Sequence, residues 1–327
     1  MKLIVVFIFI SLQLLSSACA QNLSGLTGIR DTSYSNFSAL QSSRKTKADI
    51  RLVPELQNAA ISKKQSLVYT SYGHRKMLLD AFYPTQKSNR NHIAILIIHG
   101  GGWRSGDRSQ HYALASYLAN LGYTCFTPEY RLSTEALFPA AVYDLKAAIR
   151  WIRKEAPNYA IDTSRITALG FSAGGELAAF LGVTGNLPLF EGTSGLEKGK
   201  TNVGAIIDLD GILSFVHPES GEGDDRKNIS AATYWLGYPK KGNEHLWEAA
   251  SSLSYVSPYT PPTLFINSSV NRMHAGRDDY RALLKGYGIY TEVKTFPDAP
   301  HSFPQFEPWF TPGVQTIDQF LQKVFVK

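Results

Sequence analysis

Two patterns of apolar and polar positions recur along the chain and predict a regular succession of strands and helices. Residues 92–99 (HIAILIIH) form a near-continuous apolar run, typical of a strand buried on both faces of a sheet. Residues 139–154 place apolar side chains three or four positions apart, which predicts an amphipathic helix. We expect further strands at 66–71, 76–83, 123–128, 165–170, 203–209, 263–267 and 290–296, and further helices at 111–121, 174–181, 278–287 and 311–324.

Strands that alternate with helices predict the α/β class, with a mostly parallel sheet covered by helices on both faces. We expect residues 65–327 to form one such domain. Residues 21–64 are rich in Ser, Asn and Thr and show little periodicity, so we expect a loosely ordered leader with a short helix around 54–61. Two stretches rich in Gly, Ser and charge, 186–201 and 215–243, are expected to be functional or mobile insertions, because ordinary connections are shorter.

The first twenty residues have the pattern of an export signal. Lys2 is followed by an apolar run over 3–10, and a small-residue A-x-A pattern occupies 18–20. The run is shorter than the ~20 residues that a membrane span needs, so no integral span is expected. A lipoprotein signal with Cys19 as the lipidated residue is the alternative, although the residues before Cys19 match one poorly. The pattern predicts cleavage after Ala20 and a secreted or periplasmic protein.

Composition and charge narrow the class of protein. With 44% hydrophobic residues, 18% charged residues and two cysteines, the chain is globular and is neither disordered nor a disulfide scaffold. Its net charge of +6 is spread out, with no run of more than two basic residues, which argues against a nucleic-acid partner. No Cys/His cluster has metal-ligand spacing and no Gly-rich phosphate loop occurs, so neither a metal nor a cofactor is expected.

The sharpest chemical signal is a G-x-S-x-G motif at 170–174, between a short apolar strand and a helix. In this context Ser172 is predicted to lie on a nucleophile elbow, a tight turn that leaves no room for Cβ atoms beside the serine. The amide of Ala173 opens the helix, where free N–H groups and the helix dipole favour developing negative charge. The motif therefore indicates a serine nucleophile.

Two further motifs supply the partners that a serine nucleophile needs. His99-Gly-Gly-Gly-Trp103 directly follows the buried strand, and its glycines allow close approach of a substrate oxygen, so Gly101 and Gly102 are predicted to form an oxyanion hole with Ala173. His301 follows the last predicted strand, and a neutral imidazole has the right pKa to act as the general base.

Together these motifs resemble the α/β-hydrolase superfamily over about four fifths of the chain. The resemblance extends to the esterase branch that includes hormone-sensitive-lipase-like enzymes and bacterial feruloyl and acetyl esterases. It depends on HGGGW at 99–103, PEYRL at 128–132, FPAA at 138–141, GFSAGGEL at 170–177 and the loop of His301. The resemblance implies serine-dependent ester hydrolysis, often the deacylation of plant cell-wall polysaccharides.

The third member of the implied catalytic triad departs from the family pattern. The family usually places its acid just after the strand that corresponds to 263–267, but this chain has no carboxylate in the loop 268–272. A second known solution places the acid after the preceding strand, where Asp210 lies, so we rank Asp210 first and Asp278 second. Asp279, Glu219 and Asp298 remain open, and Asp210 is alternatively a carboxylate that caps loop amides.

The sequence predicts an acylated carbohydrate substrate, with an acetyl ester of xylan or pectin as the first expectation. Trp103, Arg272 and His274 are candidate substrate-binding residues: the indole as a stacking face, the two basic groups as contacts for a uronate or a sugar hydroxyl. A short-chain lipid esterase, a lipase or a peptidase on the same fold stays open, although the insertion 215–243 is polar and unlike a lipase lid. A catalytically inactive binding module also stays open, because fold alone does not decide function. Nothing in the sequence indicates the oligomeric state.

Overall fold

An eight-stranded sheet forms the middle layer of the molecule, which a computed structural model describes over residues 23–86, 92–185, 187–192 and 199–326. The strand order is β2-β3-β5-β4-β6-β7-β8-β9; β3 is antiparallel to β2 and β5, and every pair from β5 to β9 is parallel. The strands are β2 (Ile61–Tyr72), β3 (Arg75–Pro84), β4 (Ala94–Ile98), β5 (Thr124–Pro128), β6 (Ile166–Phe171), β7 (Ala205–Leu209), β8 (Thr263–Asn267) and β9 (Thr291–Thr295). The predicted α/β class with a mostly parallel sheet is confirmed.

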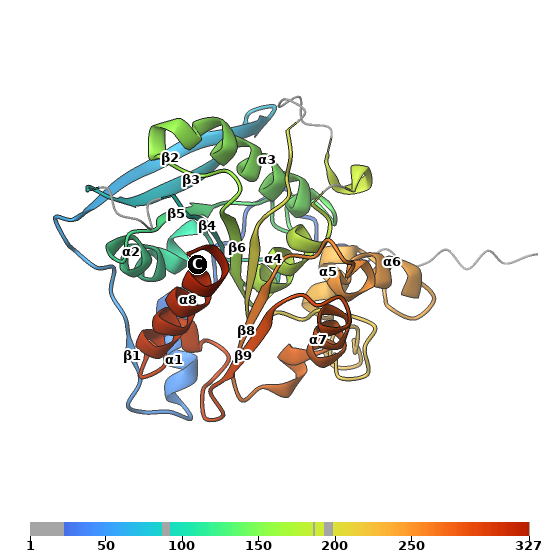
Figure 1. Cartoon of the computed structure of the whole chain (residues 1–327). Helices are drawn as coiled ribbons and strands as arrows, with labels where there is room; N and C mark the ends of the chain where they lie inside the picture. Colours follow the sequence, from blue (N-terminus) through green and yellow to red (C-terminus); the bar gives the residue numbers. More distant parts are fainter. Residues whose placement is uncertain (1–22, 87–91, 186, 193–198, 327) are drawn as a thin grey trace, which may run out of the picture.

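Helices cover both faces of this sheet (Figure 1). One face packs against α2 (Tyr112–Asn120) and the C-terminal α8 (Phe310–Phe325). The other packs against α3 (Ala140–Glu155), α4 (Ala173–Val183) and α7 (Arg277–Gly286). Two short helices were not predicted: α5 (Ala231–Leu236) lies within the insertion 215–243 and α6 (Glu244–Ala249) follows it. They contribute Trp235 and Trp247 to the core on the α4 side.

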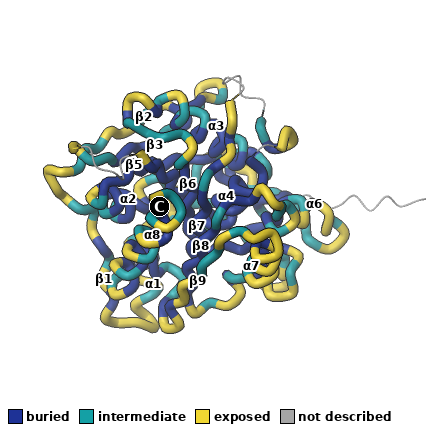
Figure 2. Tube along the Cα trace, viewed as in Figure 1, coloured by how far each residue is buried: buried dark blue, intermediate teal, exposed yellow. Residues whose placement is uncertain are grey.

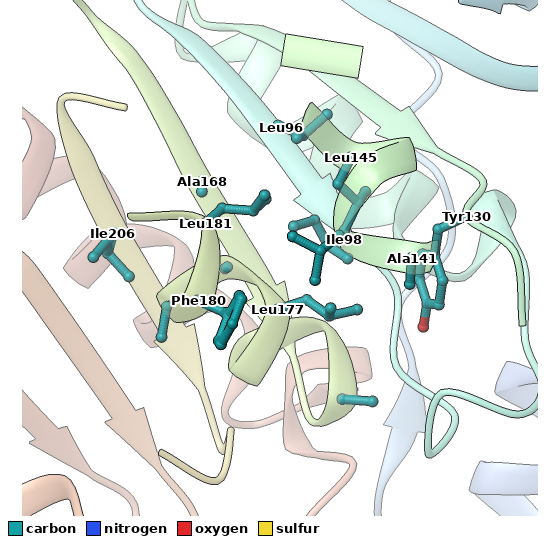
Figure 3. Close-up of a cluster of buried hydrophobic side chains, with 14 of the residues drawn as sticks. Leu96, Ile98, Tyr130, Ala141, Leu145, Ala168, Leu177, Phe180, Leu181 and Ile206 are labelled. Carbon is teal, nitrogen blue, oxygen red and sulfur yellow. The ribbon is translucent and has the colours of Figure 1, made fainter. Parts of the chain in front are cut away.

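The five central strands are buried at every position, as Figure 2 shows by their dark colour. This burial explains why their sequences are mostly apolar and do not alternate with charged residues along the strand, since each face of a parallel sheet must be covered. On the α4 face, Leu177, Phe180 and Leu181 pack with Ile98 and Ile206, and none of these side chains is exposed (Figure 3). Helix α4 is thereby fixed on the sheet, and with it the turn that precedes the helix.

Residues 23–64 are folded against the body, so the expectation of a loosely ordered leader is wrong. They contain α1 (Asn36–Arg44), and β1 (Arg51–Leu52) pairs with β10 (Phe306–Glu307). The expected helix at 54–61 is not formed, because residues 53–58 have no regular structure and β2 already begins at Ile61. Many of the contacts are polar, such as the 2.9 Å ion pair between Arg30 and the buried Glu129. A hydrophobic pattern could not have predicted them.

The expected signal at 1–20 lies outside the described residues, as does part of the insertion 186–201. In the part of the chain that the structure covers, no helix combines the length and the apolar character needed to cross a bilayer. The insertion 215–243 is described and lies beside the cleft considered below, to which it contributes Glu222 and Ala231.

Candidate active site

The loops with the predicted chemistry leave the same edge of the sheet. The loop of Gly101 and Gly102 follows β4, Ser172 follows β6, Asp210 follows β7, and the loop of His301 follows β9. In the sheet, β5 lies on one side of β4 and β6 lies on the other. The direction in which successive strands are added therefore reverses at β4. In open α/β sheets, ligands bind at the carboxyl ends of the strands at such a switch point.

Ser172 lies on a strained turn between β6 and α4. Its φ of +57° is in a region that residues other than glycine rarely adopt. The flanking glycines are required by space: a Cβ on Gly170 would lie 1.9 Å from the carbonyl oxygen of Gly174, and a Cβ on Gly174 would lie 2.2 Å from that of Ile98. This is the strand–turn–helix geometry of a nucleophile elbow.

We expect Gly174→Ala to destabilise the fold by more than about 3 kcal/mol, because the new methyl group meets the main chain of β4, which cannot move without disturbing the sheet. Urea denaturation of the purified variant measures this change. The control is Gly313→Ala in α8, where a Cβ would meet nothing within 4 Å and should stabilise the helix by up to about 1 kcal/mol. A Gly174→Ala protein as stable as wild type would contradict the steric account.

His301 links Ser172 to Asp210 through its two ring nitrogens. Nε2 lies 2.8 Å from Ser172 Oγ, and Nδ1 lies 2.9 Å from Asp210 Oδ2. With the ring hydrogen on Nδ1, the imidazole donates a hydrogen bond to the Asp210 carboxylate and accepts one from the Ser172 hydroxyl. The structure thus brings together the three residues that the sequence analysis ranked first for nucleophile, base and acid.

Asp210 is buried and held as an anion. Burial alone would raise its pKa, but contacts with His274, His301 and Ser268 outweigh burial and lower the pKa from 3.8 to about 2. The Ser268 amide donates to Oδ1 over 2.7 Å, and His274 Nε2 lies 3.4 Å from the same oxygen. Asp210 is therefore a carboxylate above about pH 3 and can stabilise a charged His301.

The other candidate acids face away from His301. Asp278 is in α7 with a side chain that is 71% exposed, and it pairs with Arg277. Asp279 and Glu219 lie beside His217, and Asp298 accepts a hydrogen bond from Trp309. The loop after β8, which lacks the family's usual carboxylate, instead supplies the Ser268 amide that holds Asp210. The carboxylate beside His301 thus follows β7, one strand before the loop in which the family pattern led us to expect it.

Three main-chain amides are available to an oxygen bound next to Ser172. Gly101, Gly102 and Ala173 all line the cleft around the serine. Within the described ranges, none of their N–H groups donates to a protein acceptor. Gly101 has a φ of +117°, and its own Cβ would overlap the Ser105 carbonyl oxygen, so only glycine fits there. These are the three amides that the sequence assigns to an oxyanion hole, and that role stays a prediction.

A cleft of about 260 Å³ opens at Ser172 and His301. The sequence analysis missed several of its lining residues, among them Tyr34 and Glu222. Tyr34 comes from the N-terminal segment and its hydroxyl accepts a hydrogen bond from Gln305 Nε2 over 3.2 Å; Glu222 comes from the insertion 215–243. Neither lies in a recognisable motif, and both reach the cleft only through the tertiary fold.

The predicted substrate-binding residues take three different positions. Arg272 lines the cleft with a side chain that is 54% exposed, 3.5 Å from Glu222. His274 lies behind the cleft against Asp210, so the expected direct substrate contact is not provided. Trp103 lines the cleft but is only 4% exposed, and one indole face is stacked on Trp235, so it offers no open stacking face to a sugar.

The described residues contain no group of three or more His, Cys, Asp and Glu side chains that could hold a metal ion. The chemistry of the cleft is instead that of a serine, a histidine and a carboxylate beside free amides. With the sheet topology, this arrangement defines the class of the protein: it is an α/β-hydrolase.

Comparison with known proteins agrees with this class. The BD-FAE family model matches residues 79–273. Esterase LipQ of Mycobacterium tuberculosis is 30% identical over 236 residues, which are 71% of this chain and 55% of LipQ, so the chain spans about half the length of that relative.

Among solved structures, a "truncated form of carbohydrate esterase from gut microbiota" has a TM-score of 0.66 at 22% identity, covering 82% of this chain and all of that one. A "bifunctional GH43-CE" of Bacteroides eggerthii has a TM-score of 0.67 at 21% identity, covering 80% of this chain and 38% of that one. These two likenesses show the shared fold. The chain belongs to the BD-FAE family and is placed among the α/β-hydrolase esterases.

Proposed function

We propose that the protein is a serine carboxylesterase that removes acyl groups, acetyl first among them, from plant cell-wall polysaccharide such as xylan or pectin. The observation that supports catalysis most directly is the hydrogen-bonded chain Ser172–His301–Asp210 in an open cleft. The same three groups in this geometry would be unnecessary in a module that only binds sugars.

The reaction follows from the positions of these groups. Ser172 Oγ attacks the ester carbonyl while His301 Nε2 takes its proton, and the amides of Gly101, Gly102 and Ala173 bind the resulting oxyanion. His301 then protonates the leaving alkoxide, which frees the sugar hydroxyl and leaves an acyl group on Ser172. A water molecule, deprotonated by His301, attacks this acyl-enzyme; the acid departs and Ser172 regains its proton.

Three features favour a carbohydrate that carries a short acyl group as the substrate. The cleft is small and suits a short acyl group. Its lining includes the charged pair of Arg272 and Glu222, whose groups can hydrogen-bond with sugar hydroxyls. A protein with the same fold, from gut microbiota, is itself described as a carbohydrate esterase.

The decisive experiment measures acetate release from acetylated xylan and acetylated pectin by wild type and Ser172→Ala. Release that vanishes in the variant supports the proposal and ranks the two polymers. No release from either polymer, with a small aryl acetate still cleaved, would transfer the substrate to feruloyl, methyl or lipid esters. Absence of hydrolysis on all of them, and on peptides, would favour a binding module.

Arg272→Ala is expected to raise KM for acetylated oligosaccharides about tenfold, because one hydrogen bond to a charged group contributes roughly 1.5 kcal/mol. Hydrolysis of an aryl acetate, which has no sugar to contact, should change less than twofold. Arg226→Ala is the matched control, since this arginine is 88% exposed and pairs only with Asp224 among the salt bridges of the described residues. An unchanged KM for the oligosaccharide would remove Arg272 from substrate binding.

Export is part of the same proposal, because a polymer substrate lies outside the cell. Its support is the sequence pattern at 1–20. N-terminal sequencing of the mature protein should give Gln21 as the first residue; a blocked, lipidated Cys19 would indicate the lipoprotein alternative instead.

A further inference from the structure

One side-chain hydrogen bond connects the oxyanion loop to the nucleophile helix. The indole Nε1 of Trp103 donates to Glu176 Oε2 over 3.1 Å. Trp103 directly follows Gly101 and Gly102, and Glu176 lies in the first turn of α4, three residues after Ala173. The bond therefore joins the two chain segments whose amides face the cleft next to Ser172.

The loop needs such an attachment, because its backbone is held in uncommon conformations. Gly101, Gly102 and Trp103 have φ values of +117°, +61° and +55° in succession. For a bulky residue such as tryptophan a positive φ persists only where surrounding contacts impose it. The face of the Trp103 ring is stacked on Trp235 at 4.8 Å and 9°, which fixes the plane of the indole. The Glu176 bond fixes its direction within that plane.

Burial of the Glu176 carboxyl group costs free energy that packing alone does not require. It is fully buried, and its Oε1 has no hydrogen-bond partner among the described residues. Burial raises the pKa of Glu176 well above its ordinary value, although the Trp103 hydrogen bond opposes this, and nearby Asp208 raises it further. An apolar side chain of similar size would fill the same space without this cost.

We propose that Glu176 is a positioning residue: through the Trp103 indole it sets the separation between the amides of Gly101 and Gly102 and the amide of Ala173. The inference rests on the proposed esterase function. In that reaction the amides must stand about 3 Å from an oxygen that becomes negative, and a small displacement of one loop weakens stabilisation of the transition state more than binding of the substrate.

The test compares Glu176→Gln, Glu176→Leu and Trp103→Phe with wild type. Glu176→Gln keeps an oxygen that accepts the indole N–H, whereas the other two variants remove the bond. We expect Glu176→Leu and Trp103→Phe to lower kcat for an aryl acetate about 10- to 100-fold with KM changed less than twofold, and Glu176→Gln to stay within about threefold of wild type. Leu181→Ala in the same helix is the control for lost stability: it should lower Tm without lowering kcat of the folded enzyme.

A second readout does not depend on ester turnover. The rate at which a fluorophosphonate labels Ser172, followed by intact mass, also requires the oxyanion amides, because the phosphoryl oxygen occupies their site. We expect this rate to fall by a similar factor in Glu176→Leu and Trp103→Phe. A labelling rate and kcat that stay within twofold of wild type, with only Tm lowered, would overturn the positioning role.

The same two readouts separate the inference from the proposed function. Wild type that is labelled but hydrolyses no ester would overturn the function, while the relative labelling rates of the variants still decide the role of Glu176. Wild type that is neither labelled nor active would overturn both.

Discussion

Ser172→Ala is expected to lower kcat for ester hydrolysis by about 10⁴- to 10⁶-fold, the range found when the nucleophile of a serine hydrolase is removed. The reason is that no neighbouring group can form the acyl-enzyme in its place: His301 loses the hydroxyl that lies 2.8 Å from Nε2. The residual rate would come from the oxyanion amides and from substrate binding. Initial rates with an aryl acetate measure the loss over several orders of magnitude.

The fold should survive this change, since the backbone geometry of the elbow depends on its glycines and main-chain hydrogen bonds. Tm should therefore shift little, because the hydroxyl of Ser172 is not required for folding. Ser254→Ala, at an exposed serine, is the matched control and should retain full activity. A Ser172→Ala enzyme with more than about 1% of the wild-type kcat would exclude Ser172 as the nucleophile.

The parts of the fold that the sequence predicted are those fixed by local patterns. The strand at 263–267 has the predicted bounds in β8, and the other central strands and helices differ from prediction by a few residues at most. The elbow and the oxyanion loop are also local, because their glycines mark positions where a Cβ would meet the main chain. Such features can be read without knowing which segments lie side by side.

What the sequence could not provide depends on contacts between distant segments. The N-terminal segment has few apolar residues, yet it folds onto the body through Leu40, Ile50 and the pair Arg30–Glu129, and it brings Tyr34 to the cleft. The bond between Trp103 and Glu176 joins positions 73 residues apart, so neither residue alone indicates it.

The identity of the triad acid shows how far the sequence alone can predict the site. Chain order placed both Asp210 and Asp278 between the serine and the histidine, and a spacing argument could only rank them. The tertiary fold decides between them: Asp210 follows β7, next to the strand that precedes Ser172, and the loop after β9 brings His301 Nδ1 within 2.9 Å of its carboxylate. Asp278 lies in α7 with an exposed side chain. That difference leads to a direct test of the two aspartates.

Asp210→Asn is expected to lower kcat about 10⁴-fold, whereas Asp278→Asn should leave it within twofold of wild type. The amide that replaces the carboxylate removes the anion 2.9 Å from His301 Nδ1, so the imidazole is no longer held in the tautomer that accepts the serine proton, and its charged form is no longer stabilised. Because the pKa of Asp210 is about 2, this carboxylate remains ionised throughout the neutral and mildly acidic range, and the deficit of Asp210→Asn should persist from about pH 5 to pH 8. The pair of variants is well matched, since each exchanges one aspartate for its isosteric amide.

Measurement of kcat and KM over that pH range separates catalysis from binding, and labelling by a fluorophosphonate reports the reactivity of Ser172 independently. Labelling of Asp210→Asn should slow along with kcat, because both need His301 to take the serine proton. Equal losses in the two variants would point to a general effect on stability, to be checked by Tm. A large loss in Asp278→Asn alone would transfer the acid to α7 and require its exposed side chain to turn inward during the reaction, against the geometry in which Arg277 now holds it.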